Sequence, residues 1–146
     1  LTSLDLSGFN TSNVTSMQSM FSGCSSLTSL DLSGFDTGEV TNMAAMFNSC
    51  TNLTSLNLSG FDTSKVASMV HMFLYCDNLT SLDSPKNIST SLSVSTTSLD
   101  TTSLLDIIEN LAVISIACTL TLGSTLLAKL TEDQIAIATN KGWTVA

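Results

Sequence analysis

The chain has 146 residues, of which 43% are apolar, enough for one domain with a sizeable core. Its 12 acidic residues face four Lys and no Arg, so the net charge is -8 at pH 7. Because there is no basic patch, neither nucleic acid nor an anionic membrane surface is expected as a partner. The longest apolar run, Leu111 to Cys118, is far shorter than the ~20 residues that span a bilayer, so no membrane insertion is expected.

A sequence of nine residues recurs at intervals of 26 along the first part of the chain. Residues 27–35 read LTSLDLSGF, residues 1–9 are identical, and residues 53–61 differ only by Asn57 in place of Asp. A fourth copy starts at Leu79 and stops at Asp83. An internal repeat of this length predicts a solenoid, in which each repeat forms one coil and only stacked coils bury a core.

The first half of each copy has the pattern of a half-buried strand. In the second copy, Leu30 and Leu32 alternate with the polar residues Ser29, Asp31 and Ser33. We predict that the equivalent Leu side chains of successive coils stack inside a shared core. The Gly that follows each strand half predicts a turn with positive φ, which Gly adopts without a Cβ penalty.

The second half of each copy has apolar residues at helical spacing. In the second copy these residues are Val40, Met43, Met46, Phe47 and Cys50. Their separations of three, three, one and three positions place them on one face of a helix. Asp36 and Thr37 stand just ahead, where they are suited to cap the start of that helix.

One coil is therefore predicted to contain a strand, a Gly turn, a short helix and a return. Stacked coils give an α/β solenoid with a parallel sheet on one face and short helices on the other. Residues 1–83 supply three full repeats and the start of a fourth. Pro85 breaks the pattern, and residues 84–146 are predicted to be degenerate repeats that form a C-terminal cap.

The C-terminal segment also carries helix and strand signals. Helices are predicted over residues 103–113 and after Thr131, and strands at Leu120–Leu122 and at Trp143–Val145. Thr131 is followed by two acidic residues, a combination that favours the N-terminus of a helix.

Three of the four Cys residues, Cys24, Cys50 and Cys76, are again 26 residues apart. We expect a stacked column of small buried side chains with free thiols. A disulfide between two of them is an alternative, because coils that stack about 4.8 Å apart are within its reach. Zinc binding is disfavoured because zinc-binding Cys residues usually come in close pairs.

The repeat LTSLDLSGFDTGEVTNMAAMFNSC, at residues 27–50, and its neighbours resemble the BspA-type leucine-rich repeats of bacterial surface proteins, which also occur in mycoplasma lipoproteins. The resemblance implies a leucine-rich-repeat solenoid and a role in adhesion, and it implies no catalytic residues. Phe9, Phe35 and Phe61 stand where the commonest leucine-rich-repeat consensus has Asn or Cys, so the Asn-ladder turn of that consensus is not implied. Residues 119–146 resemble a closing segment that follows such repeats in some proteins of gut bacteria and their phages.

The polar residues of the predicted strands form a grid on the outer surface of the sheet, which we take as the candidate binding face. They are Ser3, Asp5, Ser7, Ser29, Asp31, Ser33, Ser55, Asn57, Ser59, Ser81 and Asp83. The grid contains no aromatic residue, unlike most binding hot spots, so a solvated sheet face is the favoured interpretation and a recognition surface is the alternative. The column of Asp5, Asp31 and Asp83 has the oxygen ligands that calcium uses, but Asn57 interrupts it.

No other constellation indicates catalysis. His71, the single His, is predicted to be exposed, because its equivalents Ser19 and Ala45 lie off the apolar face. Asp106 and Glu109 are three residues apart on a predicted helix, and we expect a solvated helix face there rather than an acid–base pair. We therefore expect no enzyme activity, no cofactor and no bound metal.

Two functions fit this sequence. The first is a non-catalytic surface or fibre protein that acts in adhesion by binding host proteins, glycans or cells, with weak contacts strengthened by multivalency. The second is a structural spacer or cap segment of a phage tail or fibre protein, assembled into a larger fibre. Either function places the chain outside the cell, on a cell surface or on a virion.

Overall fold

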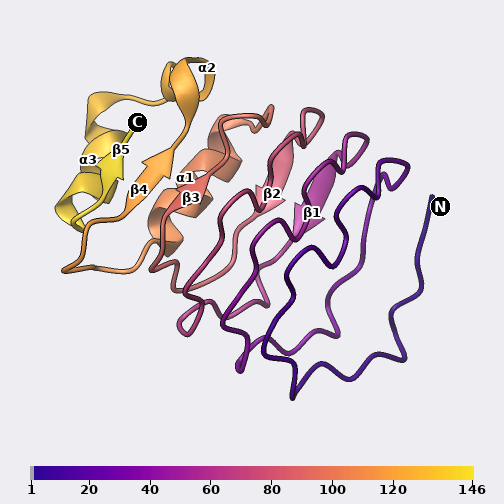
Figure 1. Ribbon diagram of the computed structural model, residues 1–146. Coiled ribbons are helices and arrows are strands. Elements are labelled where there is room, and N and C mark those ends of the chain that lie inside the picture. Colours follow the sequence, from indigo (N-terminus) through magenta and orange to yellow (C-terminus); the bar gives the residue numbers. More distant parts are fainter. Residues whose placement is uncertain (1) are drawn as a thin grey trace.

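Successive copies of the repeat lie side by side as coils, in the order of the sequence (Figure 1). The computed structural model describes residues 2–146, and Leu1, which opens the first predicted strand, lies outside the described residues. Backbone hydrogen bonds join equivalent positions of neighbouring coils. The N–H of Thr41 donates to the carbonyl of Thr15, and the N–H of Ala67 donates to that of Thr41, each at 2.8 Å. The three copies are therefore stacked in register.

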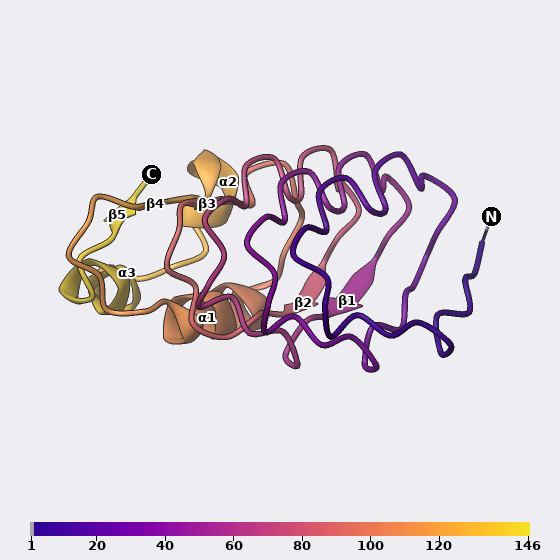
Figure 2. The same ribbon diagram turned by 60° about the horizontal axis from the view of Figure 1, so that its bottom comes forward.

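One side of the stack carries the predicted strands (Figure 2). β1 (Ser55–Asn57) and β2 (Ser81–Asp83) pair in parallel, with Leu56 opposite Leu82. Both Leu side chains are buried and the residues on either side of each are exposed, as the alternation of apolar and polar residues predicts.

The strand pattern is incomplete in the first two copies. Residues 3–5 and 29–31 form no strand, Leu4 is exposed and Leu30 is only half-buried. The prediction that every such Leu stacks inside the core is therefore wrong at this end, where a cavity lies between the first two coils and no described coil covers the first. The prediction of a positive φ is also wrong for Gly8, Gly34 and Gly60, all of which lie outside the left-handed region.

The predicted short helices do not form, and residues 2–100 contain no helix. Residues 40–50, like their counterparts in the other copies, are a run of tight turns, in which the N–H of Met46 donates to the carbonyl of Met43 at 3.2 Å. Turns that repeat every three residues produce the same apolar spacing as a helical face. Ala45 has a φ of +55°, and its equivalents in the other copies are also left-handed, which interrupts any right-handed helix.

Backbone groups that a helix would have used are bonded between coils instead. The N–H of Met17 donates to the carbonyl of Asn42 at 2.8 Å, and the N–H of Met43 donates to that of Ser68 at 2.9 Å. Alternate residues continue this pattern along each segment. This side of the stack is therefore a parallel ladder of turns rather than a layer of helices.

A buried Thr links each coil to the next. The hydroxyl of Thr37 donates to the carbonyl of Asp62 at 3.1 Å and accepts from its N–H at 2.9 Å. Thr11 makes the same pair of bonds with Asp36, at 2.9 and 2.8 Å. The predicted role of Thr37 as a helix cap is therefore wrong, because its hydroxyl satisfies the backbone of the neighbouring coil.

Apolar side chains from all the coils form one continuous core that extends to Trp143. The rings of Phe21, Phe47 and Phe73 stack in a column with centroids 5.7 and 5.9 Å apart. Burying each such side chain stabilises the stack by roughly 1.5–3 kcal/mol. Because the ring of Phe47 is covered by the rings of the coils on both sides, the stability of one coil depends on its neighbours.

Residues 84–146 continue both sides of the stack (Figure 2). On the strand side, α1 packs against β2, and α3 packs against α1. On the ladder side, β3, β4 and β5 form a parallel sheet in that order. The bounds of these elements are β3 (Leu92–Ser93), α1 (Thr101–Asn110), β4 (Thr119–Thr121), α2 (Gly123–Leu127), α3 (Glu132–Asn140) and β5 (Thr144–Val145).

Both predicted C-terminal helices are present. The start of α3 after Thr131 is confirmed, since Thr131 and Gln134 form a reciprocal capping box. The helix predicted over 103–113 begins and ends two to three residues earlier than predicted, because the carboxylate of Asp100 accepts the N–H of Ser103 at 2.8 Å and caps α1.

Candidate binding face

A side chain holds the turn at the end of each strand half. The N–H of Ser33 donates to Oδ1 of Asp31 at 2.9 Å, and the N–H of Ser59 donates to Oδ1 of Asn57 at 2.9 Å. The first copy repeats the arrangement between Asp5 and the Ser two positions later. Such turns are typical of Asp and Asn, whose short side chains reach the backbone two residues on. They fix the Asp, Asn and Ser side chains on the exposed surface.

The two Asp residues of these turns are negatively charged at neutral pH. The hydroxyl and then the N–H of Ser7 hold the pKa of Asp5 below its ordinary value of 3.8. The N–H and then the hydroxyl of Ser33 do the same for the pKa of Asp31. Both carboxylates are exposed to solvent, so the face presents two anionic groups on neighbouring coils.

Two equivalent cavities open on this face, each between neighbouring coils. The cavity between the first and second coils has a volume of about 410 Å³, and the cavity between the second and third coils has about 210 Å³. The polar and aromatic lining of the first comprises Asp5, Ser7, Asp31, Ser33 and Phe35, and that of the second comprises Asp31, Ser33, Asn57, Ser59 and Phe61. The turn of the second copy thus borders both cavities. The smaller second cavity lies nearer the paired strands β1 and β2.

The predicted face residues include no aromatic residue, but a largely buried aromatic ring lies beside each cavity. Phe35 lines the first cavity and Phe61 lines the second. Their rings are nearly parallel, with centroids 6.4 Å apart, and both are largely buried. The sequence grid omitted them because each Phe follows the Gly and was assigned to the turn rather than to the strand.

The remaining predicted face residues lie outside both cavities. These are Ser3, Ser29, Ser55, Ser81 and Asp83. The row of turns ends at the fourth copy, where Pro85 takes the position of the donating Ser and has no N–H to offer.

Asp106 of α1 accepts the N–H of Ser84 at 2.6 Å and bonds the side chain of Asn110. The prediction of a simply solvated Asp106 is therefore wrong, because it ties α1 to β2.

The structure gives the calcium alternative no site. Among residues 2–146, no three His, Cys, Asp or Glu side chains converge as metal ligands. Oδ1 of Asp5 and Oδ1 of Asp31 are each engaged by the Ser of their own turn. Each carboxylate therefore holds the turn of its own coil.

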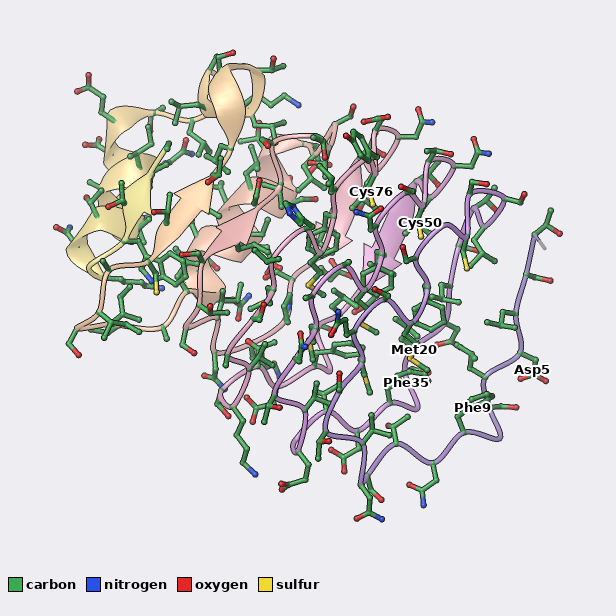
Figure 3. All side chains as sticks on the ribbon, viewed as in Figure 1. Asp5, Phe9, Met20, Phe35, Cys50 and Cys76 are labelled. Atoms are coloured by element: carbon green, nitrogen blue, oxygen red, sulfur yellow. The ribbon has the colours of Figure 1, made fainter. Side chains whose placement is uncertain are left out.

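The Cys column contains free thiols (Figure 3). The thiol of Cys50 donates to the carbonyl of Phe21, and the thiol of Cys76 donates to that of Phe47, each at 3.1 Å. Burial, with a smaller contribution from the preceding Cys, raises the pKa of Cys50 to about 11 and that of Cys76 to about 12. Thiols in this state are poor nucleophiles and poor metal ligands.

A third cavity lies on the ladder side, where the third coil meets β3 and β4. It has a volume of about 380 Å³ and a mainly apolar lining that includes Met69, His71 and Leu92. His71 is exposed, as predicted, but no pattern of residues predicted a cavity beside it. No Asp, Glu, Lys or Cys lines this cavity, so it lacks a partner that would activate His71 as a base.

Within residues 2–146, no helix combines the length and the apolar character needed to cross a bilayer. The chain matches no curated protein and no solved structure. Residues 1–108, which contain the repeats, β1 to β3 and most of α1, match the family described as "Mycoplasma protein of unknown function, DUF285". With 108 of its 146 residues matched, the chain belongs to this mycoplasma-type family.

Proposed function

We propose that the chain is a leucine-rich-repeat solenoid of the BspA type, and that it belongs to a non-catalytic surface or fibre protein that acts in adhesion. In-register stacking of the copies and the buried Leu pair of β1 and β2 support the solenoid. The proposal places the chain outside the cell, on a cell surface or on a virion. Its ligand is a protein or a glycan on another cell.

The observation that carries the proposal is the pair of equivalent cavities on the strand side. Each combines Asp or Asn with Ser hydroxyls, beside a Phe ring that is itself buried. A carboxylate accepts hydrogen bonds, and a hydroxyl both accepts and donates them. Sugar hydroxyls and the basic side chains of peptides are the ligand groups that match this set.

Charge narrows the choice of ligand. The net charge of -8 and the ionised Asp5 and Asp31 disfavour sulfated or phosphorylated ligands, because like charges repel across the face. A neutral glycan or a Lys-bearing peptide meets no such penalty. Because the two cavities are equivalent and lie on neighbouring coils, a ligand with a repeating polar unit would engage both at once.

The test uses a multimerised form of the chain on arrays of glycans and host surface proteins, since single sites of this kind bind weakly. The matched variant is Asp5→Asn with Asp31→Asn, which removes both charges and keeps the turn, as Asn57 does in the third copy. The expected result is binding by the unchanged chain and a loss of roughly tenfold or more in the double variant.

The control removes the same charge elsewhere. Asp77 and Asp133 are exposed and lie outside both cavities, so Asp77→Asn with Asp133→Asn should leave binding intact. Equal loss in both double variants would mean that net charge, and not the strand side, governs binding.

A structural spacer of a fibre is the second candidate. The continuous Phe column and the inter-coil ladder favour it, because both resist bending of the stack. If the unchanged multimer binds nothing on the arrays, a structural spacer becomes the better-supported function.

A further inference from the structure

The third coil carries large side chains at four ladder positions where the first two coils carry small or polar ones. They are Val70, His71, Leu74 and Tyr75, in place of Gln18, Ser19, Ser22 and Gly23 in the first coil and Ala44, Ala45, Asn48 and Ser49 in the second. Val70 is 59% exposed and Tyr75 is 54% exposed, so these two side chains do not fill the core. The first three of the four line the third cavity. The third coil therefore differs from its neighbours where this cavity opens.

The ladder that joins the coils stops at the same place, where β3 follows the third coil (Figure 2). In the second coil, alternate N–H groups donate to carbonyls of the third at 2.9 to 3.0 Å, namely those of Met43, Ala45 and Phe47. Their equivalents in the third coil are the N–H groups of Met69, His71 and Phe73. Within residues 2–146, no acceptor takes a hydrogen bond from any of these three. The third coil therefore turns three unpaired donors toward β3, and the first two belong to residues that line the cavity.

The ladder stops because the fourth coil, which contains β3, crosses this side with fewer residues. In the third coil, Asp62 and Leu74 accept bonds from the second and are twelve positions apart. In the fourth coil, Lys86 and Thr96 accept the equivalent bonds and are ten positions apart. An extended segment covers the same distance with fewer residues than a run of tight turns. The backbone of β3 therefore does not follow the turns of the third coil.

The third cavity combines these donors with apolar side chains and a row of hydroxyl groups. The apolar lining includes Met69 and Leu92, and the hydroxyl groups belong to Ser91, Ser93, Thr119 and Thr121. Its volume of about 380 Å³ lies in the range of ligand sites. Because no Asp, Glu or Lys lines the cavity and the chain has a net charge of -8, the site disfavours acidic ligands.

Donors on alternate residues match the carbonyl groups of an extended peptide, which point to one edge at every second residue. Each coil of the stack satisfies the N–H groups of the preceding coil with alternate carbonyls in this way. A compact acid or amide would engage two of the three donors at most. The spacing of the donors therefore favours a peptide over a compact ligand.

We propose that the third cavity binds an extended, uncharged or basic peptide segment of a partner protein, which adds to the ladder as a further strand adds to the edge of a sheet. Alternate carbonyls of the peptide accept from the N–H groups of Met69, His71 and Phe73. An apolar side chain of the peptide packs against Val70 and Leu74. This site lies on the ladder side of the stack, so it is separate from the cavities on the strand side.

Amide hydrogen exchange, followed by NMR, tests whether the donors are free. In the unliganded chain, the N–H groups of Met69 and His71 should exchange faster than those of Met43 and Ala45, whose acceptors are present. A bound peptide should slow the exchange at Met69 and His71 and leave it unchanged at Met43 and Ala45. Equal exchange at the equivalent positions of the unliganded chain overturns the proposal.

The ligand probe is a displayed library of random ten-residue peptides, selected on the full chain. The variant Val70→Gln with Leu74→Asn restores the residue types of Gln18 and Asn48, and it should weaken binding of the enriched peptides by roughly tenfold or more. The matched control, Ala44→Val with Asn48→Leu, places the same apolar side chains on the second coil, whose N–H groups are paired. Titration calorimetry of this control should still show one peptide bound per chain.

Three results of the selection contradict a peptide site at the third coil. A library that enriches no peptide, binding that Val70→Gln with Leu74→Asn leaves intact, or a second site in the control each overturns the proposal. Equally tight binding of a single N-acetylated amino acid that carries the apolar side chain of the peptide also overturns it, because the cavity would then take a compact ligand.

Discussion

Asn57 in the third copy and Asp31 in the second accept the same hydrogen bond, from the N–H of the Ser two positions later, at 2.9 Å in each case. The turn that borders the cavities therefore depends on a side-chain oxygen at this position and not on a negative charge. Asp31→Asn should therefore remove the charge that a ligand would meet and keep the turn.

Asp31→Asn should keep the thermal midpoint of the unchanged chain, whereas Asp31→Ala should lower it, because Ala offers no acceptor to the N–H of Ser33. Circular dichroism melts of the two variants measure the difference. Because the position is exposed, the drop for Ala should remain small. Equal midpoints for Asn and Ala would show that water replaces the side-chain acceptor at no cost.

Acid should weaken the fold in a narrow pH range. The pKa values of Asp5, Asp31 and Asp100 are lowered in the folded chain, chiefly by hydrogen bonds from the Ser residues nearby. A carboxyl group with a depressed folded-state pKa contributes stability that is present above its unfolded value of 3.8 and is lost as the pH falls through the folded value. These groups should therefore leave the urea midpoint unchanged between pH 7 and about 5, and they should lower it below about pH 4.

The substitution that checks this assignment is Asp5→Asn with Asp31→Asn. Its midpoint should fall less between pH 5 and pH 2 than that of the unchanged chain, because two of the titrating groups are gone. Asp77→Asn is the control, since no hydrogen bond to the Asp77 carboxylate is present in residues 2–146, and its acid profile should match that of the unchanged chain.

Equivalent Leu positions should differ in their contribution to stability. Leu56 is buried in β1, where it pairs with Leu82 of β2. Leu56→Ala should destabilise the chain by about 2–5 kcal/mol through lost transfer energy and a residual cavity. Leu4 is partly exposed on the first coil, so Leu4→Ala should cost less than about 1 kcal/mol. Equilibrium unfolding in urea gives both values. Similar losses at the two positions would mean that the end coil is as well packed as the middle of the stack.

Much of the core was predictable because the repeat interval alone aligns equal residues. Alternation of apolar and polar residues identified Leu56 and Leu82, and the 26-residue interval identified the Phe47 and Phe73 column. The buried Thr column was missed although its signal was visible. Thr recurs at one position in all three copies, while the next residue is Ser, Gly or Ser. A Thr that is present in every copy, next to a position that varies, indicates that its hydroxyl makes a specific hydrogen bond.

The ladder of turns was not predictable in the same way. Apolar residues at Met43, Met46 and Phe47 have spacings that a helix and successive turns share, and the left-handed φ of Ala45 that separates the two has no signal in the residue type. The cavities depend on how far neighbouring coils diverge, which the repeat interval does not encode. The position of Phe35 beside a cavity could therefore be recognised only from the structure.

Thiol reactivity should follow position in the column. Cys50 and Cys76 are buried and their pKa values are raised to about 11 and about 12, so little thiolate forms at pH 8. Cys24 is only half-buried in the first coil, so an alkylating reagent should reach it before the other two. Mass spectrometry of the native chain after a short exposure measures the order, and addition of urea should equalise the rates. Early modification of Cys76 in the native chain would contradict the buried column.

Removing one buried hydroxyl should loosen two coils at once. Thr37→Val preserves the shape of the side chain but leaves both the N–H and the carbonyl of Asp62 without their partner, a loss of about 1–3 kcal/mol for unsatisfied buried groups. The matched control is Thr41→Val, because the hydroxyl of Thr41 also donates to the neighbouring coil, at 3.1 Å from the carbonyl of Thr15, but is exposed to water. The control should cost less than about 0.5 kcal/mol, since water replaces its bond. Equal losses of unfolding free energy in urea for the two variants would mean that burial of the hydroxyl is irrelevant. An unfolding free energy that Thr37→Val leaves unchanged would mean that the hydroxyl bonds between coils add no stability beyond the packing of the apolar side chains.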